Sequence, residues 1–183
     1  MPGFTIHIAI AKQYLNKHKN EILNEKDFIK GVIAPDLDET MYEISRDKNK
    51  SHYGTWHILP VETNIDMFLN DSSVDINNDY WKGYLLHLLT DFYFYNKFFL
   101  KECLKMKNNN NNIYYDYDCL NKDLIERYQI TILENIKKYM NFIDGTPKYL
   151  DKDKVIIFIE KISSLNLDNQ IKIILEKGME GLN

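Results

Sequence analysis

At 183 residues the chain is long enough to form one domain of ordinary size with a core of its own, so we expect a single domain over residues 1–183. The 23 Lys and Arg against 27 Asp and Glu give a formal net charge of −4, which excludes a basic surface that would hold nucleic acid without sequence preference. Only two of the cations are arginines, Arg46 and Arg127, which argues against an arginine clamp for phosphate.

The cysteines and the N-terminal stretch indicate the cellular compartment in which the protein is expected. Cys103 and Cys119 are too few and too far apart for a disulfide framework or a zinc knuckle, and we expect both to be ordinary thiols in a reducing compartment. The stretch "MPGFTIHIAIAKQYL" lacks a basic region before its short apolar part, which contains His7, so it is a poor signal peptide. No run approaches the roughly 18 apolar residues of a membrane span. These features predict a soluble, cytoplasmic protein without a transmembrane segment.

Apolar residues recur at helical spacing along most of the chain, and alternating strand patterns with glycine-rich turns are rare, which predicts an all-α fold. The first helix is expected over residues 6–18, with Thr5 as its cap. His7 then lies in the first turn. His18 falls on a lysine-rich face and is expected to be solvated.

The next segment is expected to break at a proline. Residues 27–34, "DFIKGVIA", predict a short buried helix that stops at Pro35, because the residue before a proline is disfavoured in a helix. Asp36 follows at that break. The polar, interrupted segment 36–60 predicts a loop with short helical pieces, and loops of this kind often carry function.

The rest of the chain is also predicted to be helical. The asparagine run over 108–112 reads as a low-complexity surface loop. Further helices are predicted over residues 61–69, 79–107, 119–143, 151–163 and 167–179. The fold expected from the sequence is therefore a multi-helix domain around a long, central, buried helix.

That central helix contains "GYLLHLLTDFYFY", in which His87 and Asp91 are the groups that ionise at neutral pH among Leu, Phe, Tyr and Thr. Residues four apart lie on one face of a helix, so the two side chains can reach a common point. A buried carboxylate without a partner is costly or takes up a proton. The pair therefore predicts either a buried hydrogen bond or a metal site, since two ligands at this spacing are a recurring way to hold zinc.

Three more histidines lie among apolar or aromatic residues. His7 is in "FTIHIAIA", His52 in "KSHYG" and His57 in "TWHILP". A single histidine among apolar residues is usually a core residue whose hydrogen bonds are satisfied. Together with Asp36 and Asp91, they predict a cluster.

The order "IHIAIA", "GVIAPD", "SH" and "GYLLHLLTD" resembles the bacterial zinc-dependent phospholipase C family, which is similar in fold to single-strand-specific zinc nucleases. The resemblance covers residues 1 to about 100, and "LLHLLTD" is its most specific part. It implies an all-helical zinc hydrolase of phosphodiester bonds. It also implies that Asp36, His52, His87 and Asp91 hold one zinc ion. Asp91 would bridge from this ion to a second zinc ion, which His7 would also bind.

The sequence departs from the family at two places. Secreted members complete the second zinc with an N-terminal tryptophan, which has no counterpart here, so Asp38, Glu39, His57 or water are candidates to complete it. The family's third zinc needs histidines after the bridging aspartate, and none occurs after His87. The resemblance therefore implies two zinc ions.

The chemistry that the family implies is attack on a phosphodiester by a hydroxide that bridges the two metals, with Asp36 orienting or deprotonating the water. The substrate would be a small phosphodiester or a phospholipid head group. The alternative is a non-catalytic helical protein in which a structural zinc, closed by four protein ligands, or a buried polar network holds the helices together. A phosphohydrolase of the HD type is less favoured, because no His-Asp dipeptide occurs.

Overall fold

The computed structural model describes residues 3–37, 48–55, 62–108 and 113–182. Within them the chain is all-α, as predicted, apart from one antiparallel ladder of two short strands, β1 (Gly54–Thr55) and β2 (Glu62–Thr63). The helices are α1 (Phe4–Lys17), α2 (Glu25–Leu37), α3 (Lys48–Ser51), α4 (Ile65–Asn70), α5 (Asp79–Tyr93), α6 (Leu100–Asn108), α7 (Tyr114–Tyr128), α8 (Glu134–Lys137), α9 (Lys152–Ile162) and α10 (Leu167–Lys177), with a π-helical turn at Phe94–Phe98 and a 3-10 turn at Met179–Leu182.

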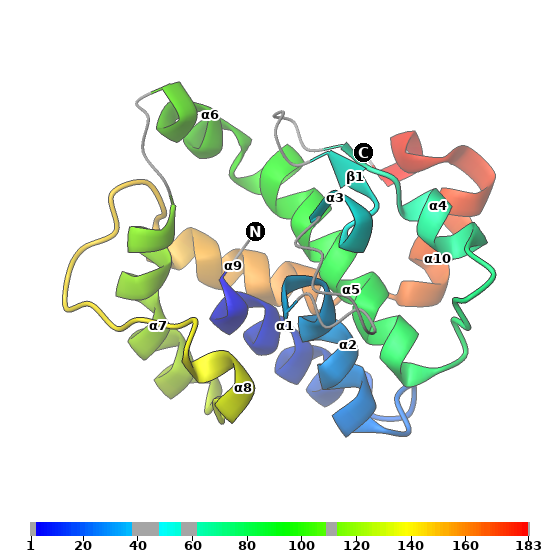
Figure 1. The fold of residues 1–183 in the computed structure, drawn as a ribbon, viewed down its shortest axis with the longest axis horizontal. Helices are drawn as coiled ribbons and strands as arrows, with labels where there is room; N and C mark the ends of the chain where they lie inside the picture. Colours follow the sequence, from blue (N-terminus) through cyan, green and yellow to red (C-terminus); the bar gives the residue numbers. More distant parts are fainter. Residues whose placement is uncertain (1–2, 38–47, 56–61, 109–112, 183) are drawn as a thin grey trace.

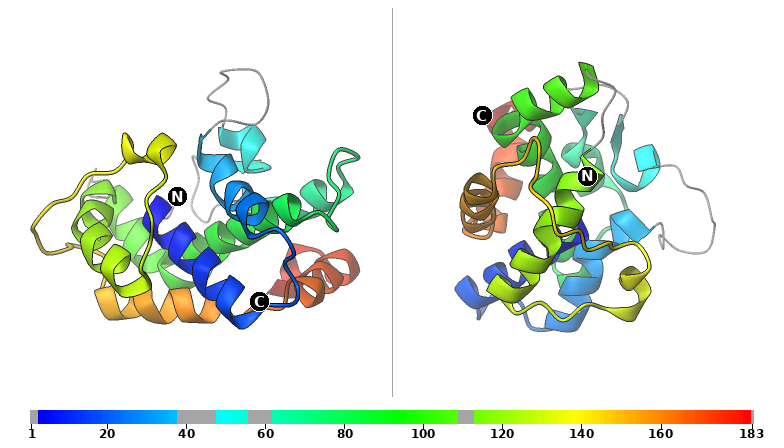
Figure 2. Two further views of the ribbon diagram at one scale, coloured as in Figure 1. Left: turned by 90° about the horizontal axis from the view of Figure 1, so that it is seen from below. Right: turned by 90° about the vertical axis from the view of Figure 1, so that its left-hand side faces the viewer.

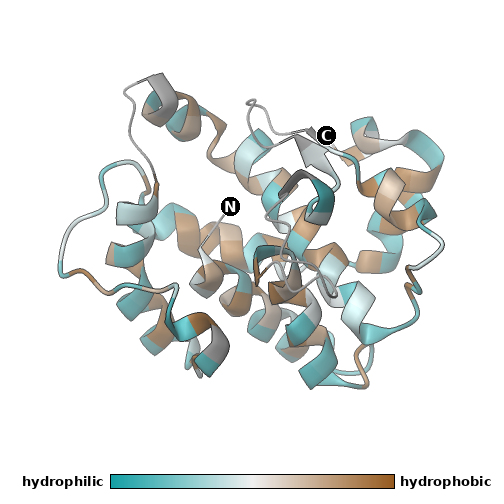
Figure 3. Cartoon of the chain, viewed as in Figure 1, coloured by the Kyte–Doolittle hydropathy of each residue, from teal (hydrophilic) through white to brown (hydrophobic). Residues whose placement is uncertain are grey.

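Helix α5 lies at the centre of the molecule, with α7 and α8 toward one end and α4 and α10 toward the other (Figure 1). Most of its residues are buried, His87 and Asp91 among them. Helix α1 packs against both α2 and α9 (Figure 2). The helices alternate hydrophobic and hydrophilic stretches (Figure 3), and their buried residues form one core that extends from Ile6 to Leu182. The central buried helix of the sequence prediction is thus confirmed.

Helices α2 and α5 touch backbone to backbone, where each carries a glycine. A Cβ atom added to Gly31 would lie 1.9 Å from the carbonyl oxygen of Tyr80, and one added to Gly83 would lie 2.0 Å from that of Phe28. Real Cβ atoms do not approach an oxygen so closely, so this crossing requires glycine on both helices. The contact holds the last turn of α2, which carries Asp36, beside the middle of α5.

The predicted start of the first helix is wrong. Helix α1 begins at Phe4, with Gly3 at its N-cap and no capping side chain. Thr5 lies inside the helix, and its hydroxyl donates to Oδ1 of Asn121 in α7 at 2.5 Å. The Thr5 hydroxyl therefore makes a tertiary hydrogen bond and does not cap the helix. This bond holds the first turn of α1, which contains His7, against α7.

The predicted stop at Pro35 is also wrong, because α2 continues through it to Leu37. The bias against helix before a proline is a preference that packing can override, and a proline in the last turn removes only one helical hydrogen bond. Pro35 is buried among the core residues of α2. Asp36 therefore lies in the last turn of a helix and not in a loop.

Two long predicted helices are interrupted. The segment 79–107 forms α5, the π turn and then α6, and Phe99 donates its backbone N–H to the carbonyl of Phe94 at 2.9 Å. Residues five apart point about 140° away from each other in an α-helix, whereas a π turn brings them to one side. Phe94 and Phe99 can therefore both pack on Phe158, with ring centroids 5.5 and 5.9 Å away.

The second interruption divides the segment 119–143. Helix α7 ends at Tyr128, because Gln129 adopts a left-handed conformation with φ of 50°. A short helix, α8, follows after a gap. The helices predicted over 151–163 and 167–179 are confirmed as α9 and α10, and both cysteines are buried free thiols, as expected.

Candidate metal centre

Five side chains with metal-binding groups meet in the interior of the molecule. His7 comes from the first turn of α1, Asp36 from the last turn of α2, and His52 directly follows α3. His87 and Asp91 lie one turn apart in α5. The side chains of all five are at most 1 % exposed. The sequence predicts a cluster of these residues together with His57, and the structure brings these five together.

Two triangles of donor atoms share the edge between His52 and His87. The Nε2 atoms of these histidines are 3.2 Å apart. Oδ2 of Asp91 lies 3.6 Å from Nε2 of His52 and 3.3 Å from that of His87. Oδ1 of Asp36 lies 3.3 and 3.7 Å from the same two nitrogens. Four ligands held tetrahedrally at zinc distances lie about 3.3 Å from one another, so each triangle has the size of one face of such a site.

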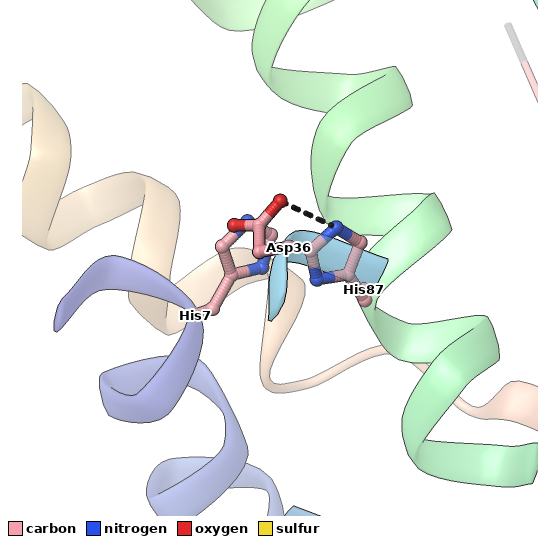
Figure 4. Close-up of side chains that lie close together, drawn as sticks. All are labelled: His7, Asp36 and His87. Atoms are coloured by element: carbon pink, nitrogen blue, oxygen red, sulfur yellow. Dashed lines mark ion pairs between the residues drawn. The ribbon is translucent and has the colours of Figure 1, made fainter. Parts of the chain in front are cut away.

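Asp91 divides its two oxygens between two groups of histidines. Oδ2 faces His52 and His87, whereas Oδ1 lies 3.4 Å from Nε2 of His7. His7, Asp36 and His87 have ligand atoms within 4.8 Å of one another, and Figure 4 shows the three side chains together, with the ion pair between Asp36 and His87 marked. The rings of His7 and His87 stack with centroids 4.0 Å apart. Asp91 thus presents one oxygen to His7 and the other to His52 and His87.

Hydrogen bonds fix the direction of the central histidine. Nδ1 of His87 lies 2.7 Å from the carbonyl oxygen of Val32 in α2. A carbonyl oxygen only accepts, so Nδ1 carries the proton and a neutral His87 presents a bare Nε2 to the cluster. Metal-binding histidines commonly have such a partner behind them.

Several polar atoms of the cluster have no hydrogen bond among the described residues. Both ring nitrogens of His7 and both carboxylate oxygens of Asp91 are buried in this state. A buried carboxylate that lacks hydrogen bonds is costly unless a cation lies beside it. Asp36 adds a second negative charge at the C-terminus of α2, where the helix dipole disfavours an anion. The arrangement requires a positive charge at its centre.

The pKa values show which group supplies that charge when only protons are present. Burial acts to lower the pKa of His87, but the carboxylates of Asp91 and Asp36 outweigh it and raise the pKa above its ordinary value. Burial acts to raise the pKa of Asp91, but His87 and His7 hold it well below its usual range. Burial and the neighbouring His87 lower the pKa of His7. Without metal, the two carboxylates thus favour the protonated form of His87.

The structure does not test the other candidate ligands that the sequence suggests. His57, Asp38 and Glu39 lie outside the residues that the structure describes. His18 is not solvated as predicted, since its side chain is 13 % exposed, pairs with Glu21 at 3.0 Å and stacks on Tyr14.

Sequence reasoning did not single out Val32 or Ser51, which contact the outer nitrogens of His87 and His52. Val32 acts through its backbone, which no side-chain pattern reveals. Ser51 was visible only as the residue before His52.

Comparison of the chain with protein-family models, with curated proteins and with solved structures gives no match. Among the described residues, no helix is both long enough and apolar enough to cross a membrane. Any statement about activity therefore depends on the geometry of the cluster and on the motif resemblance.

Proposed function

We propose that this protein is a zinc-dependent hydrolase of phosphodiester bonds, with two ions bound at the cluster. The observation that carries the proposal is the divided carboxylate of Asp91, which faces one group of histidines with each oxygen. The motif resemblance to zinc-dependent phospholipases C supports the same residues. The donor set of imidazole nitrogens and carboxylate oxygens suits zinc.

The five side chains would divide between two ions. His7 and Asp91 hold the second ion, with Asp36 and His87 close by. The first ion is held by Asp36, His52, His87 and Asp91. Zinc bound there would lower the pKa of water and polarise the phosphoryl oxygens of a diester. With zinc bound, the carboxylate of Asp36 would be the group that accepts the proton of the attacking water, and the burial of the five side chains would limit access of bulk solvent. The substrate is a small phosphodiester or a phospholipid head group.

A second reading is a structural zinc site in a non-catalytic protein. It is favoured by the two triangles of donor atoms, because Asp36, His52, His87 and Asp91 together supply four ligands, which is the closed set of a structural site. A closed site has no coordination position for water. The number of bound ions therefore separates the two readings.

Metal analysis and hydrolysis together test the proposal. Protein purified without chelator and dialysed against zinc should contain about two ions per chain, and it should hydrolyse bis(4-nitrophenyl) phosphate faster than a choline phospholipid, because the aryl leaving group is activated. Exhaustive chelation should lower the melting temperature by roughly 10 °C, since a metal that binds only the folded state stabilises it.

Two other outcomes would contradict the hydrolase proposal. One ion per chain without hydrolysis of either substrate would establish the structural reading. Less than about 0.2 ion per chain in a folded protein, with a melting temperature that chelation leaves unchanged, would establish a buried hydrogen-bonded network instead.

The pH dependence should distinguish a proton from a metal at the centre. The pKa of folded His87 lies above the unfolded value of 6.5, so its contribution to stability is complete below pH 6.5 and is lost as the pH rises through the folded pKa. His7, with a lowered pKa, titrates below this window. In the chelated protein the melting temperature should therefore fall from pH 6.5 upward.

The zinc-loaded protein should keep its melting temperature over the same range, because a metal takes the place of the proton. The difference between the two forms should thus widen as the pH rises through the folded pKa of His87. The comparison is made by differential scanning calorimetry at constant ionic strength. A difference that stays constant with pH would show that His87 does not carry the proton.

A further inference from the structure

The first turn of α1, residues 4–7, is held by contacts with α7 and with the segment after α8. Gly3 occupies the N-cap position and offers no side chain to the first backbone N–H groups of the helix. It lies close to α7, because a Cβ atom added to Gly3 would be 3.1 Å from the ring of Tyr117. Phe4 stacks on Tyr139, with ring centroids 6.0 Å apart. Tertiary contacts therefore take the place of a cap.

Asn121 in α7 makes the hydrogen bonds that fix this turn. Its side-chain N–H₂ group donates to the backbone carbonyl of Asn141 at 2.8 Å, and its Oδ1 accepts from the hydroxyl of Thr5 at 2.5 Å. A carbonyl oxygen only accepts, so the Asn141 carbonyl decides which way the amide faces, and Oδ1 is left for Thr5. The side chains of Asn121 and Thr5 are both buried, so water does not compete for the bond between them.

The segment that receives the amide of Asn121 is itself fixed to α7. The side chain of Asn141 donates to Oδ2 of Asp118 at 3.4 Å, and the backbone N–H of Ile143 donates to the carbonyl of Asp118 at 3.2 Å. Asn121 is thus held from behind by a bound segment. Through Thr5 it restricts the movement of the first turn of α1.

His7 lies two residues after Thr5 and depends on this turn for its place in the cluster. Its Nε2 lies 3.4 Å from Oδ1 of Asp91, and its ring stacks on His87. The outer nitrogen of a metal-binding histidine commonly has a hydrogen-bond partner that orients the ring, but Nδ1 of His7 has none among the described residues. The backbone of the turn must therefore supply the orientation.

The other four side chains of the cluster come from α2, from α5 and from the residue after α3. The glycine crossing of α2 and α5 holds the elements that carry three of them, Asp36, His87 and Asp91. The support that α7 gives to α1 therefore acts on one member of the cluster, His7.

We propose that Asn121 is a positioning residue, which holds His7 in place through Thr5 and thereby sets the affinity of the metal centre for the second ion. The second part of the proposal rests on the proposed metal function. The first part does not, because the position of His7 can be measured without metal. Helix α7 thus supports the site although none of the five side chains comes from it.

Backbone amide hydrogen exchange, followed by NMR in the chelated protein, tests the first part. Asn121→Ala should make the amides of residues 6–8 exchange at least about 10-fold faster than in the wild type, because the first turn opens more often. The ring signals of His7 should shift at the same time, since the ring no longer stacks steadily on His87.

Ser163→Ala is the matched control, because it acts on the opposite end of the same helix. The hydroxyl of buried Ser163 accepts from Nζ of Lys17 in the last turn of α1 at 2.8 Å. Exchange should become faster at that end and stay unchanged at residues 6–8. Unchanged exchange at residues 6–8 in folded Asn121→Ala, or equal acceleration there in both variants, would overturn the proposal whether or not the protein binds zinc.

Zinc titration against a competing chromogenic chelator tests the second part. Asn121→Ala should weaken the binding of one ion by about 10-fold and leave the other unchanged, whereas a general loss of stability would weaken both. Thr5→Val removes the hydroxyl, keeps the shape of the side chain and should have the same effect. Thr5→Ser keeps the hydroxyl and should restore the affinity. The effects of Thr5→Val and Asn121→Ala should not add, because both remove the same bond.

The outcomes separate this inference from the proposed function. Wild-type protein that binds no second ion would contradict the function and the second part of the inference, and the exchange measurement would still decide whether Asn121 positions His7. If the wild type binds two ions, equal weakening of both in Asn121→Ala would contradict the role of Asn121 and leave the metal centre standing. Unchanged affinity for both ions would do the same.

Discussion

Asp91→Asn is expected to abolish binding of both metal ions, whereas His7→Ala should lose only one. The two oxygens of Asp91 face different histidines, Oδ2 toward His52 and His87 and Oδ1 toward His7. An asparagine removes the negative charge and directs an amide N–H₂ group, which cannot bind a cation, toward one of the two positions. Metal content should fall from about two ions per chain to fewer than about 0.2, and His7→Ala should keep about one.

Metal analysis after dialysis measures these contents, and far-ultraviolet circular dichroism verifies that both variants are folded. Equal loss of metal in folded Asp91→Asn and His7→Ala would contradict the bridging role of Asp91. Two ions retained in Asp91→Asn would remove it from the ligand set altogether.

Gly83→Ala is expected to destabilise the protein and to disrupt the metal centre, although no ligand is changed. The added Cβ would lie 2.0 Å from the carbonyl oxygen of Phe28, so α2 and α5 must move apart. Overpacking of this kind costs about 3 kcal/mol, which corresponds to a melting temperature lower by roughly 6–12 °C. Asp36 then moves away from His87, and the zinc affinity should fall in parallel.

Gly178→Ala provides the matched control, because it is the same substitution at a site with no atom within 4 Å of the added Cβ. Its φ of 65° and ψ of −168° define a conformation that alanine rarely adopts, so a loss of about 1–3 kcal/mol is expected with unchanged metal content. Urea unfolding and calorimetric zinc titration measure both effects. A Gly83→Ala protein that binds zinc as tightly as Gly178→Ala would show that the metal centre does not need this close contact.

The sequence predicted which residues come together better than it predicted the elements that carry them. His87 and Asp91 could be paired from their spacing alone, because a continuous apolar helix leaves them no solvent. Asp36 was placed in a loop, since the helix-breaking tendency of Pro35 is a local property and the packing of its ring against the core is not. Thr5 and Pro35 do have the local preferences assumed from the sequence, but tertiary contacts override these preferences in the fold.

Two features of the site depend on contacts between distant segments. The ring Nδ1–H of His87 donates to the backbone carbonyl of Val32 in α2. The close crossing of α2 and α5 that brings these groups together depends on a glycine in each helix. The π turn after α5 depends on packing against Phe158, far along the chain. No periodicity within one segment encodes either feature. They became visible only once the helices were placed together.

The spread of the ligands along the chain bears on how the protein folds. His7 and Asp91 lie at opposite ends of the first half of the sequence, and their close approach requires closure of a long loop, with the entropy loss which that entails. Folding must overcome this loss by packing α1, α2 and α5 before the histidines and carboxylates meet. We therefore expect the complete cluster to form after these helices have packed, because only then do His7 and Asp36 reach the pair His87 and Asp91.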